Sequence, residues 1–125
     1  MTPRVLIVED ESLLVMVLED LLPELGYEVV ATAHSVQTAL QAMDEHEPDV
    51  AILDINLAGA ASFPIADELG RRGIPYLFAS GYGRAALPVR HADAVLVRKP
   101  FGRQELADAL AGMPERKAAR LIDAS

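Results

Sequence analysis

The amino-acid sequence predicts an α/β protein built on a doubly wound, five-stranded parallel sheet. Three observations lead to this fold class. Five apolar runs alternate along the chain with segments of helical periodicity, which is the pattern of strand-helix-strand units. The runs are apolar throughout, as expected of strands that helices cover on both faces. The length of 125 residues corresponds to one domain.

The apolar runs define the expected strands, and most of them stop at polar or charged residues. In chain order they span residues 4–8, 27–33, 50–55, 75–80 and 94–97. Right-handed crossovers join parallel strands, so the carboxyl ends of all the strands are expected at one edge of the sheet.

Helical patterns fill the connections between these runs. Ser12 is the expected N-cap of a first helix that reaches toward Gly26, and Ser35 is the expected N-cap of a second. The first helix has leucines spaced for one buried face, namely Leu14, Leu18, Leu21 and Leu25. Pro23 lies inside this pattern and removes a backbone hydrogen bond, so we expect the helix to kink or end near Leu22.

Two later helices are expected at about residues 64–72 and 102–112, the second with Leu106 and Leu110 on one face. The connection over residues 81–93 should hold another helix. Because it contains two glycines and a proline, we expect only a short or irregular fourth helix there.

The composition argues against several classes of protein. The formal charge of −8 opposes nucleic-acid binding, which relies on Lys and Arg. The absence of cysteine rules out disulfides and thiolate metal sites. The sequence has neither the ~18-residue apolar run of a membrane span nor the pattern of a signal peptide. We therefore expect a cytoplasmic protein that binds neither nucleic acid nor membrane.

Polar side chains gather at the expected edge of the sheet. Glu9 and Asp10 follow the first strand, Asp54 ends the third, Ser80 ends the fourth and Lys99 follows the fifth. Three carboxylates in one pocket repel one another unless one takes up a proton or a cation binds, and Mg²⁺ suits the second case. With such a cation, Asp54 could attack phosphorus as a nucleophile while Lys99 and Ser80 contact the transferred group. Each residue alone is as readily a turn or surface residue, so the joint pattern carries the hypothesis.

The sequence closely resembles the receiver domain of two-component response regulators over about residues 4–111. "VLIVEDE" is similar to the acidic motif of the family's first strand, "AILDI" to its phosphoacceptor strand and "VRKPF" to its lysine-proline motif. The resemblance implies the flavodoxin-like strand order 2-1-3-4-5. It also implies that Asp54 is the phosphoryl acceptor, with Ser80 and Lys99 beside the phosphoryl group.

The resemblance further implies a Mg²⁺ site. Its ligands would be Asp10, Asp54 and the backbone carbonyl of Asn56, with Glu9 nearby through water. The lysine-proline motif implies a cis peptide bond before Pro100.

A narrower match is "FASGYG" at residues 78–83. It resembles the Phe-Ala-Thr-Gly-Tyr signature of a receiver subgroup that is often stand-alone and tied to general stress signalling. Gly81, Gly83 and Ala86 also fit the G-x-G-x-x-G/A spacing of a dinucleotide-binding loop. That loop follows the first strand of its fold, whereas this stretch follows the fourth, so we prefer the subgroup signature.

The chain departs from the family pattern at four places. Serine replaces the usual threonine at Ser80, and glutamate replaces a common aspartate at Glu9. The usual switch aromatic aligns with Leu96, and Tyr82 is a candidate to take over its role. Ala-Gly at residues 58–59 stands where many receivers have proline, so we expect a more mobile loop after the acceptor.

The predicted function is that of a phosphoacceptor that is charged by a histidine kinase or a histidine phosphotransfer protein. Val15 and Met16 lie off the buried face of the first helix. In the family, this helix is where phosphoryl donors dock. We expect a receiver domain at residues 1–112 and a short tail without an output domain at 113–125. Signalling would then use a downstream protein partner or drain phosphate from a shared kinase, with the chain a monomer or weak dimer.

Two alternatives stay open. One is a non-phosphorylated interaction module with a receiver fold, which would not bind Mg²⁺. The other is a nucleotide-binding or hydrolytic domain, but the sequence has no G-x-x-x-x-G-K-[ST] loop. It also lacks the second aspartate that follows the nucleophile in haloacid-dehalogenase-type phosphatases. We expect no enzymatic activity beyond autocatalytic phosphotransfer and dephosphorylation.

Overall fold

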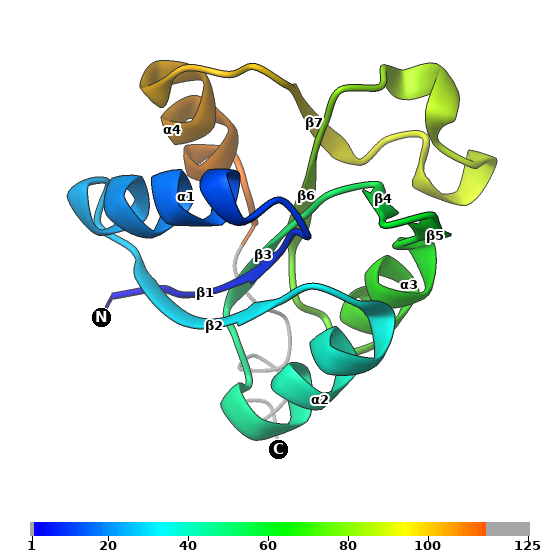
Figure 1. The fold of residues 1–125 in the computed structure, drawn as a ribbon, viewed down its shortest axis with the longest axis horizontal. Helices are drawn as coiled ribbons and strands as arrows, with labels where there is room; N and C mark the ends of the chain where they lie inside the picture. Colours follow the sequence, from blue (N-terminus) through cyan, green and yellow to red (C-terminus); the bar gives the residue numbers. More distant parts are fainter. Residues whose placement is uncertain (1, 115–125) are drawn as a thin grey trace.

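Five parallel strands form the central sheet of the computed structural model, which describes residues 2–114 (Figure 1). They are β1 (Arg4–Val8), β2 (Glu28–Ala33), β3 (Val50–Leu53), β6 (Tyr76–Ser80) and β7 (Val95–Arg98). Their order in the sheet is β2-β1-β3-β6-β7. Counted along the chain, these strands have the order 2-1-3-4-5, so the predicted doubly wound sheet is confirmed.

Helices cover both faces of the sheet (Figure 1). One face carries α1 (Ser12–Glu24) and α4 (Arg103–Ala111), and the other carries α2 (Val36–His46) and α3 (Phe63–Arg71). Each face has its own apolar core, because the strand side chains point alternately to the two sides. Leu18, Leu22, Leu106 and Leu110 are buried in one core, whereas helices α2 and α3 fill the other.

The helix starts agree in part with the sequence. Ser35 is the N-cap of α2, and its hydroxyl accepts a hydrogen bond from the Thr38 backbone N–H at 3.1 Å. The expected cap at Ser12 is wrong, because Ser12 is the first helical residue and the N-cap position belongs to Glu11. The Glu11 side chain makes no cap hydrogen bond, so α1 begins without the usual polar cap.

Helix α1 continues past Leu22 to Glu24, so it does not end at Leu22, and the expected kink there stays a prediction. Proline removes one backbone donor, but the donors that follow it are satisfied. The backbone N–H of Leu25 donates to the carbonyls of Leu21 and Leu22 at 3.2 and 3.0 Å. Leu22 is fully buried, so its packing holds the last turn in place around the proline.

The connection between β6 and β7 holds two single turns of 3₁₀ helix, η1 (Arg84–Ala86) and η2 (Val89–His91), at the upper right of Figure 1. The predicted short or irregular fourth helix is therefore confirmed. Its glycines and proline interrupt the backbone pattern that a regular α-helix needs.

A small antiparallel hairpin follows β3 and was not predicted from the sequence. Its strands are β4 (Asn56–Leu57) and β5 (Ala60–Ala61), in which Leu57 pairs with Ala60. Both residues of the turn have positive φ, 51° at Ala58 and 93° at Gly59, as two-residue hairpins of this kind require. The expected mobility of this loop stays a prediction, but the stretch has a defined backbone conformation.

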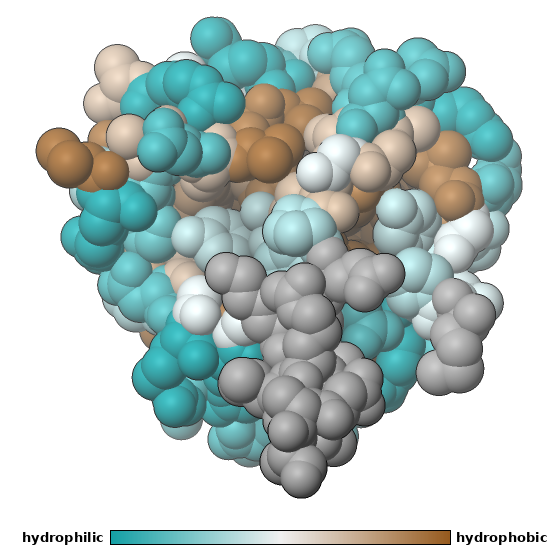
Figure 2. Space-filling model, turned by 180° about the vertical axis from the view of Figure 1, so that it is seen from behind, coloured by the Kyte–Doolittle hydropathy of each residue, from teal (hydrophilic) through white to brown (hydrophobic). Residues whose placement is uncertain are grey.

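The surface is largely polar. Seen from behind, the molecule presents mostly hydrophilic residues, with apolar residues gathered in the upper half of that face (Figure 2). Among the described residues, no helix combines the length and the apolar composition needed to cross a membrane. The tail expected from residue 113 lies, from residue 115 onward, outside the described residues.

Candidate functional site

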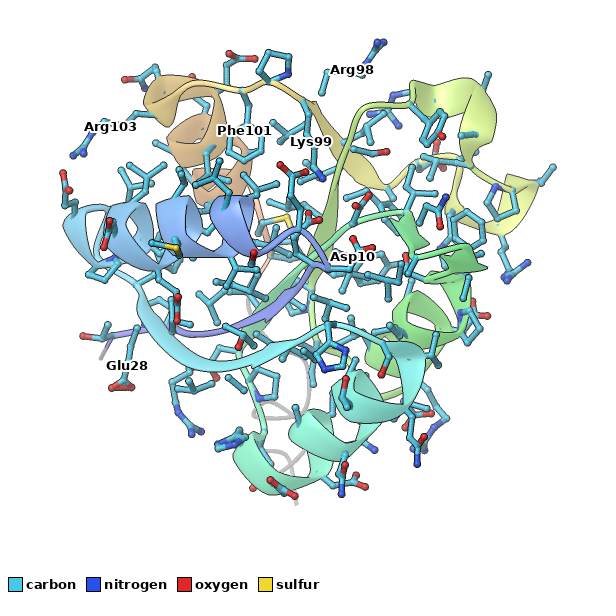
Figure 3. The ribbon with its side chains drawn as sticks, viewed as in Figure 1. Asp10, Glu28, Arg98, Lys99, Phe101 and Arg103 are labelled. Atoms are coloured by element: carbon cyan, nitrogen blue, oxygen red, sulfur yellow. The ribbon has the colours of Figure 1, made fainter. Side chains whose placement is uncertain are left out.

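The polar residues predicted from the sequence converge at the carboxyl edge of the sheet. The backbone N–H groups of Glu9, Asp54 and Lys99 donate to carbonyls of the neighbouring strands β2, β1 and β6 at 2.8–2.9 Å. These bonds extend the sheet ladder one residue beyond β1, β3 and β7. Asp10 and Lys99 therefore reach the same region above the sheet, whereas Arg98 points away from it (Figure 3).

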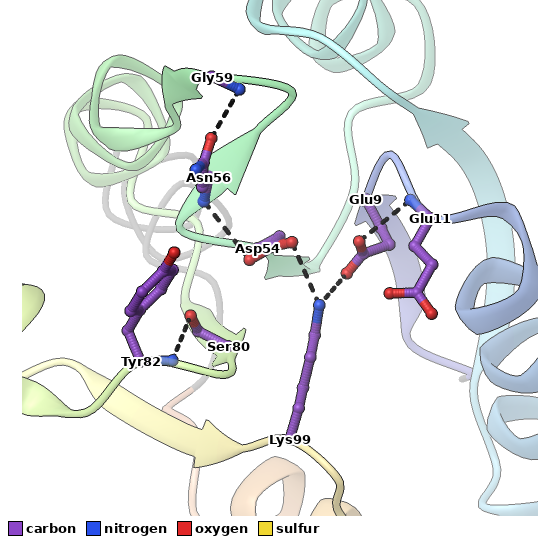
Figure 4. Close-up of polar contacts among 8 residues, drawn as sticks. All are labelled: Glu9, Glu11, Asp54, Asn56, Gly59, Ser80, Tyr82 and Lys99. Carbon is purple, nitrogen blue, oxygen red and sulfur yellow. Dashed lines mark hydrogen bonds and ion pairs between the residues drawn. The ribbon is translucent and has the colours of Figure 1, made fainter.

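Lys99 joins two of the carboxylates (Figure 4). Its Nζ lies 2.8 Å from Glu9 Oε1 and 3.1 Å from Asp54 Oδ2. The other Glu9 oxygen accepts a hydrogen bond from the Glu11 backbone N–H at 3.2 Å. Both lysine contacts are largely shielded from water, since the Glu9 side chain is 3% exposed and the Asp54 side chain 13%. One ammonium group thus holds carboxylates from two strands together.

Burial and charge shift the titration of this pair. Burial raises the pKa of Glu9 to about 7, with the Asp54 charge adding to it and the Lys99 hydrogen bond opposing it. For Lys99, burial acts to lower the pKa, but the hydrogen bonds and charges of Glu9 and Asp54 outweigh it and raise the pKa above its usual value. Lys99 is therefore cationic at neutral pH, whereas Glu9 passes from the protonated to the ionised form near pH 7.

The three carboxylates have the spacing of a cation site. One oxygen from each of Glu9, Asp10 and Asp54 lies within 4.8 Å of the other two. Carboxylate oxygens are hard donors, and Mg²⁺ takes one or two of them while keeping several waters. The donor set fits this ion, because Lys99 engages Glu9 while Asp10 lines the open cavity beside Asp54. Asn56 borders the same space, and its backbone N–H donates to Asp54 Oδ1 at 3.4 Å.

A cavity of about 360 Å³ opens above Asp54. Its lining includes Asp10, Asn56, Ser80, Tyr82 and Lys99. All the residues predicted for phosphoryl chemistry except the buried Glu9 therefore face one open space.

Ser80 and Tyr82 meet at one wall of this cavity. Ser80 is fully buried, and its Oγ accepts a hydrogen bond from the Tyr82 backbone N–H at 3.1 Å (Figure 4). The serine hydroxyl therefore keeps its own proton available to donate. The Tyr82 side chain is 58% exposed, so it has room to change its position.

The residues predicted for switching and docking lie around this site. Leu96 is half-buried on β7 and packs against the core beneath α2 and α3. The peptide bond before Pro100 is cis, as the family motif implies. Val15 is half-buried, and Met16 is 60% exposed on α1. Their roles in switching and docking stay predictions.

Sequence reasoning missed a second polar cluster, which lies on α3, β6 and η2. It consists of Asp67, Tyr76, Arg90 and His91, joined by hydrogen bonds. These residues are far apart in the chain and fit no motif, so only the register of β6 and the path of the irregular connection bring them together.

Comparison with known proteins gives the same picture as the geometry. The family model of the response regulator receiver domain matches residues 5–111. The solution structure of SdrG from Sphingomonas melonis Fr1 is 41% identical, with a TM-score of 0.78, over 87% of this chain and 93% of that one. The receiver domain of Erythrobacter litoralis PhyR is 31% identical, with a TM-score of 0.80, over 88% of each chain.

A curated relative shares only part of its length with this chain. The transcriptional regulatory protein PdtaR of Mycobacterium tuberculosis is 33% identical over 111 residues, which are 86% of this chain and 54% of that protein. The chain thus spans about half the length of the curated relatives of this kind.

Proposed function

The chain belongs to the family of response regulator receiver domains, and from this premise we propose that Asp54 accepts a phosphoryl group with Mg²⁺ bound beside it. The donor is a histidine kinase or a histidine phosphotransfer protein. The observation that supports this most directly is the lysine bridge, in which Lys99 Nζ contacts Asp54 at the floor of a cavity that Asp10 and Ser80 also line.

The side chains supply the parts that phosphoryl transfer needs. An Asp54 carboxylate oxygen attacks the phosphorus of a phosphohistidine; the new P–O bond forms as the P–N bond breaks, and the departing imidazole takes a proton from solvent. Asp10, Asp54 and the backbone carbonyl of Asn56 would hold Mg²⁺, which would offset the negative charge of the phosphoryl oxygens. Lys99 moves from the carboxylates onto a phosphoryl oxygen, and the Ser80 hydroxyl donates a hydrogen bond to another.

Intact-mass spectrometry tests this proposal. The protein is incubated with Mg²⁺ and acetyl phosphate, beside Asp54→Ala and the matched control Asp93→Ala, which removes an exposed aspartate. We expect one phosphoryl adduct on the wild type and on Asp93→Ala, and none on Asp54→Ala. An equal adduct on Asp54→Ala would refute the assignment. If no adduct forms even with a donor kinase, and Mg²⁺ does not bind, the chain is an unphosphorylated interaction module.

The exposed apolar face of α1 is the proposed contact for the donor. Leu13, Met16 and Val17 are 68%, 60% and 47% exposed, and their spacing places them on one side of the helix. Met16 also lines a hollow together with Glu9 and Asp10. We expect Met16→Glu to weaken binding to the donor without unfolding the domain, because the side chain contributes little to the core. Equal affinity with and without the substitution, measured by isothermal titration, would remove this docking surface.

We propose that the domain signals through protein contacts, that it acts in the cytoplasm, and that its pathway is stress signalling. The support is the likeness to a PhyR stress response regulator, which is 28% identical to this chain over 88% of this chain and 44% of that one. Tyr82, whose backbone N–H donates to Ser80 Oγ, is the proposed switch residue, and Leu96 holds the position of the usual switch aromatic. The phosphorylated domain acts in one of two ways: it binds a downstream protein, or it drains phosphate from a shared kinase.

A further inference from the structure

The segment that replaces the fourth helix has few attachments to the rest of the domain. It spans residues 81–94 between β6 and β7, and most of its side chains are exposed. Its two short turns are closed by local backbone bonds, such as that from the His91 N–H to the Pro88 carbonyl at 2.9 Å. Only Leu87 and His91 in this segment are buried. These two side chains therefore decide how firmly the segment is held.

His91 carries the polar part of that attachment. Its ring is 5% exposed and lies among three aromatic rings, stacked on Phe63 at 5.7 Å and edge-on to Tyr76 and Phe78 at 6.0 and 5.9 Å. Nε2 lies 2.9 Å from Asp67 Oδ1 on α3, and Nδ1 lies 2.9 Å from the Tyr76 hydroxyl on β6. One side chain thus ties the segment to a helix and to a central strand.

The chemistry of the three groups fixes the direction of both hydrogen bonds. A carboxylate only accepts, so Nε2 carries the proton and donates to Asp67. In the neutral ring Nδ1 is then an acceptor, and the Tyr76 hydroxyl donates to it. Burial raises the pKa of Tyr76, which keeps this hydroxyl protonated. The buried His91 ring keeps both of these partners only while the segment stays in place, whereas Asp67 is 46% exposed and can also meet water.

The other polar contacts of the segment hold it less firmly. Arg90 also pairs with Asp67, at 2.9 and 3.1 Å, but Arg90 is 56% exposed and such pairs contribute little in water. Arg84 donates to the carbonyls of Ala92 and Ala94, which closes the segment on itself and does not fix it to the body.

We propose that Asp67, Tyr76 and His91 form a latch, the His91 latch, which holds residues 81–94 against α3 and β6 and must open before the segment can move. The segment begins directly after Ser80, whose Oγ accepts a hydrogen bond from the Tyr82 backbone N–H. When Ser80 turns toward a phosphoryl group, the start of the segment follows it and pulls on the latch. This coupling rests on the proposed function; the latch itself does not.

Hydrogen exchange on the unphosphorylated, Mg²⁺-free protein tests the latch. Tyr76→Phe keeps the ring and removes one hydrogen bond, and His91→Phe keeps an aromatic ring and removes both. We expect the amides of residues 91, 92 and 94 to exchange about fivefold faster in Tyr76→Phe, which is the effect of one net hydrogen bond, and faster still in His91→Phe. The amides of β3 should be unchanged, which separates local opening from global unfolding.

Val89→Ala is the matched control, since Val89 lies in the same turn and is 93% exposed. If Tyr76→Phe exchanges no faster than Val89→Ala, the latch is refuted. Tyr76→Phe carries the test even where His91→Phe does not fold. In the wild type, ¹⁵N spectra should show Nδ1 of neutral His91 unprotonated, with its shift altered by Tyr76→Phe; a proton on Nδ1 in the neutral ring would contradict the latch.

Beryllofluoride, a phosphoryl mimic, tests the coupling. If the latch opposes the move of Ser80, Tyr76→Phe should bind beryllofluoride and Mg²⁺ about fivefold more tightly than the wild type, and Val89→Ala should equal the wild type. Equal affinity in all three would refute the coupling. A wild type that binds no better than Asp54→Ala would instead refute the proposed function and the coupling with it, and the exchange data would then decide the latch alone.

Discussion

Replacing the buried carboxylate Glu9 with glutamine is expected to stabilise the domain at alkaline pH. Glu9 is 4% exposed, and its pKa lies at about 7 against an ordinary value of 4.5. The folded state therefore holds a proton that the unfolded chain has already released. The stability that this proton carries is complete below pH 4.5, falls as pH rises, and is lost once pH passes 7. Glu9→Gln removes this penalty because its amide is never ionised.

The size of the effect follows from the two pKa values. Their difference corresponds to about 3 kcal/mol of unfolding free energy at pH 8, and to less than about 1 kcal/mol at pH 5. The amide oxygen of glutamine can still accept the hydrogen bond from Lys99 Nζ, which keeps the geometry of the site. Lys99 also keeps its contact with Asp54. The variant should thus gain stability over the wild type between pH 5 and pH 8.

Urea unfolding followed by circular dichroism, in EDTA at both pH values, measures this difference. Glu28→Gln is the control, since Glu28 is exposed on β2 and far from the cluster (Figure 3). Added Mg²⁺ should stabilise the wild type more than Glu9→Gln, because the ion neutralises a charge that the variant lacks. A Glu9→Gln variant whose stability relative to wild type is the same at pH 5 and pH 8 would show that burial does not control this carboxylate.

Three further predictions test other parts of the structure. Lys99→Met should raise the pKa of Glu9 further, since the hydrogen bond and the charge of Lys99 lower it; an unchanged pKa in ¹³C spectra of the Glu9 carboxyl would contradict this. Gly59→Val should lower the unfolding free energy by about 1–2 kcal/mol, because φ is 93° there, whereas Ala58→Gly should not destabilise the turn; equal urea midpoints for the two would argue against turn strain. Ser62→Ala should raise the unfolding free energy by up to about 1 kcal/mol, since the buried Ser62 hydroxyl has no hydrogen-bond partner within residues 2–114; a loss of stability would indicate a partner, such as a bound water.

The parts of the molecule that follow from strand topology were predictable. Apolar runs located the strands, and the shared edge of a parallel sheet brought Asp10, Asp54, Ser80 and Lys99 to one cavity. Neither inference needs the side-chain packing, because both depend only on where each strand ends. The cavity lining confirms that these residues meet; their chemical roles stay predictions.

Features in which tertiary packing overrides a local backbone preference could not be predicted from the sequence. Pro23 breaks a helix in isolation, but burial of Leu22 keeps the last turn of α1. Ala58 is a poor residue for positive φ, and no sequence rule places a hairpin turn there; the pairing of Leu57 with Ala60 imposes it. No sequence pattern marks His91 as a contact residue, since its partners come from elements whose relative positions the sequence does not specify.

The edge position of β7 bears on how the domain folds. β1 and β3 pair directly and bring the carboxylates of Glu9, Asp10 and Asp54 together. Lys99 arrives with β7, 90 residues after Glu9, and among the described strands β7 pairs with β6 alone. Until β7 docks, the nascent sheet gathers like charges without this cation, so repulsion slows the first pairings. Mg²⁺ would screen that repulsion, so we expect refolding to be faster in its presence. We also expect that, when β7 frays, the carboxylates are the first groups to become exposed.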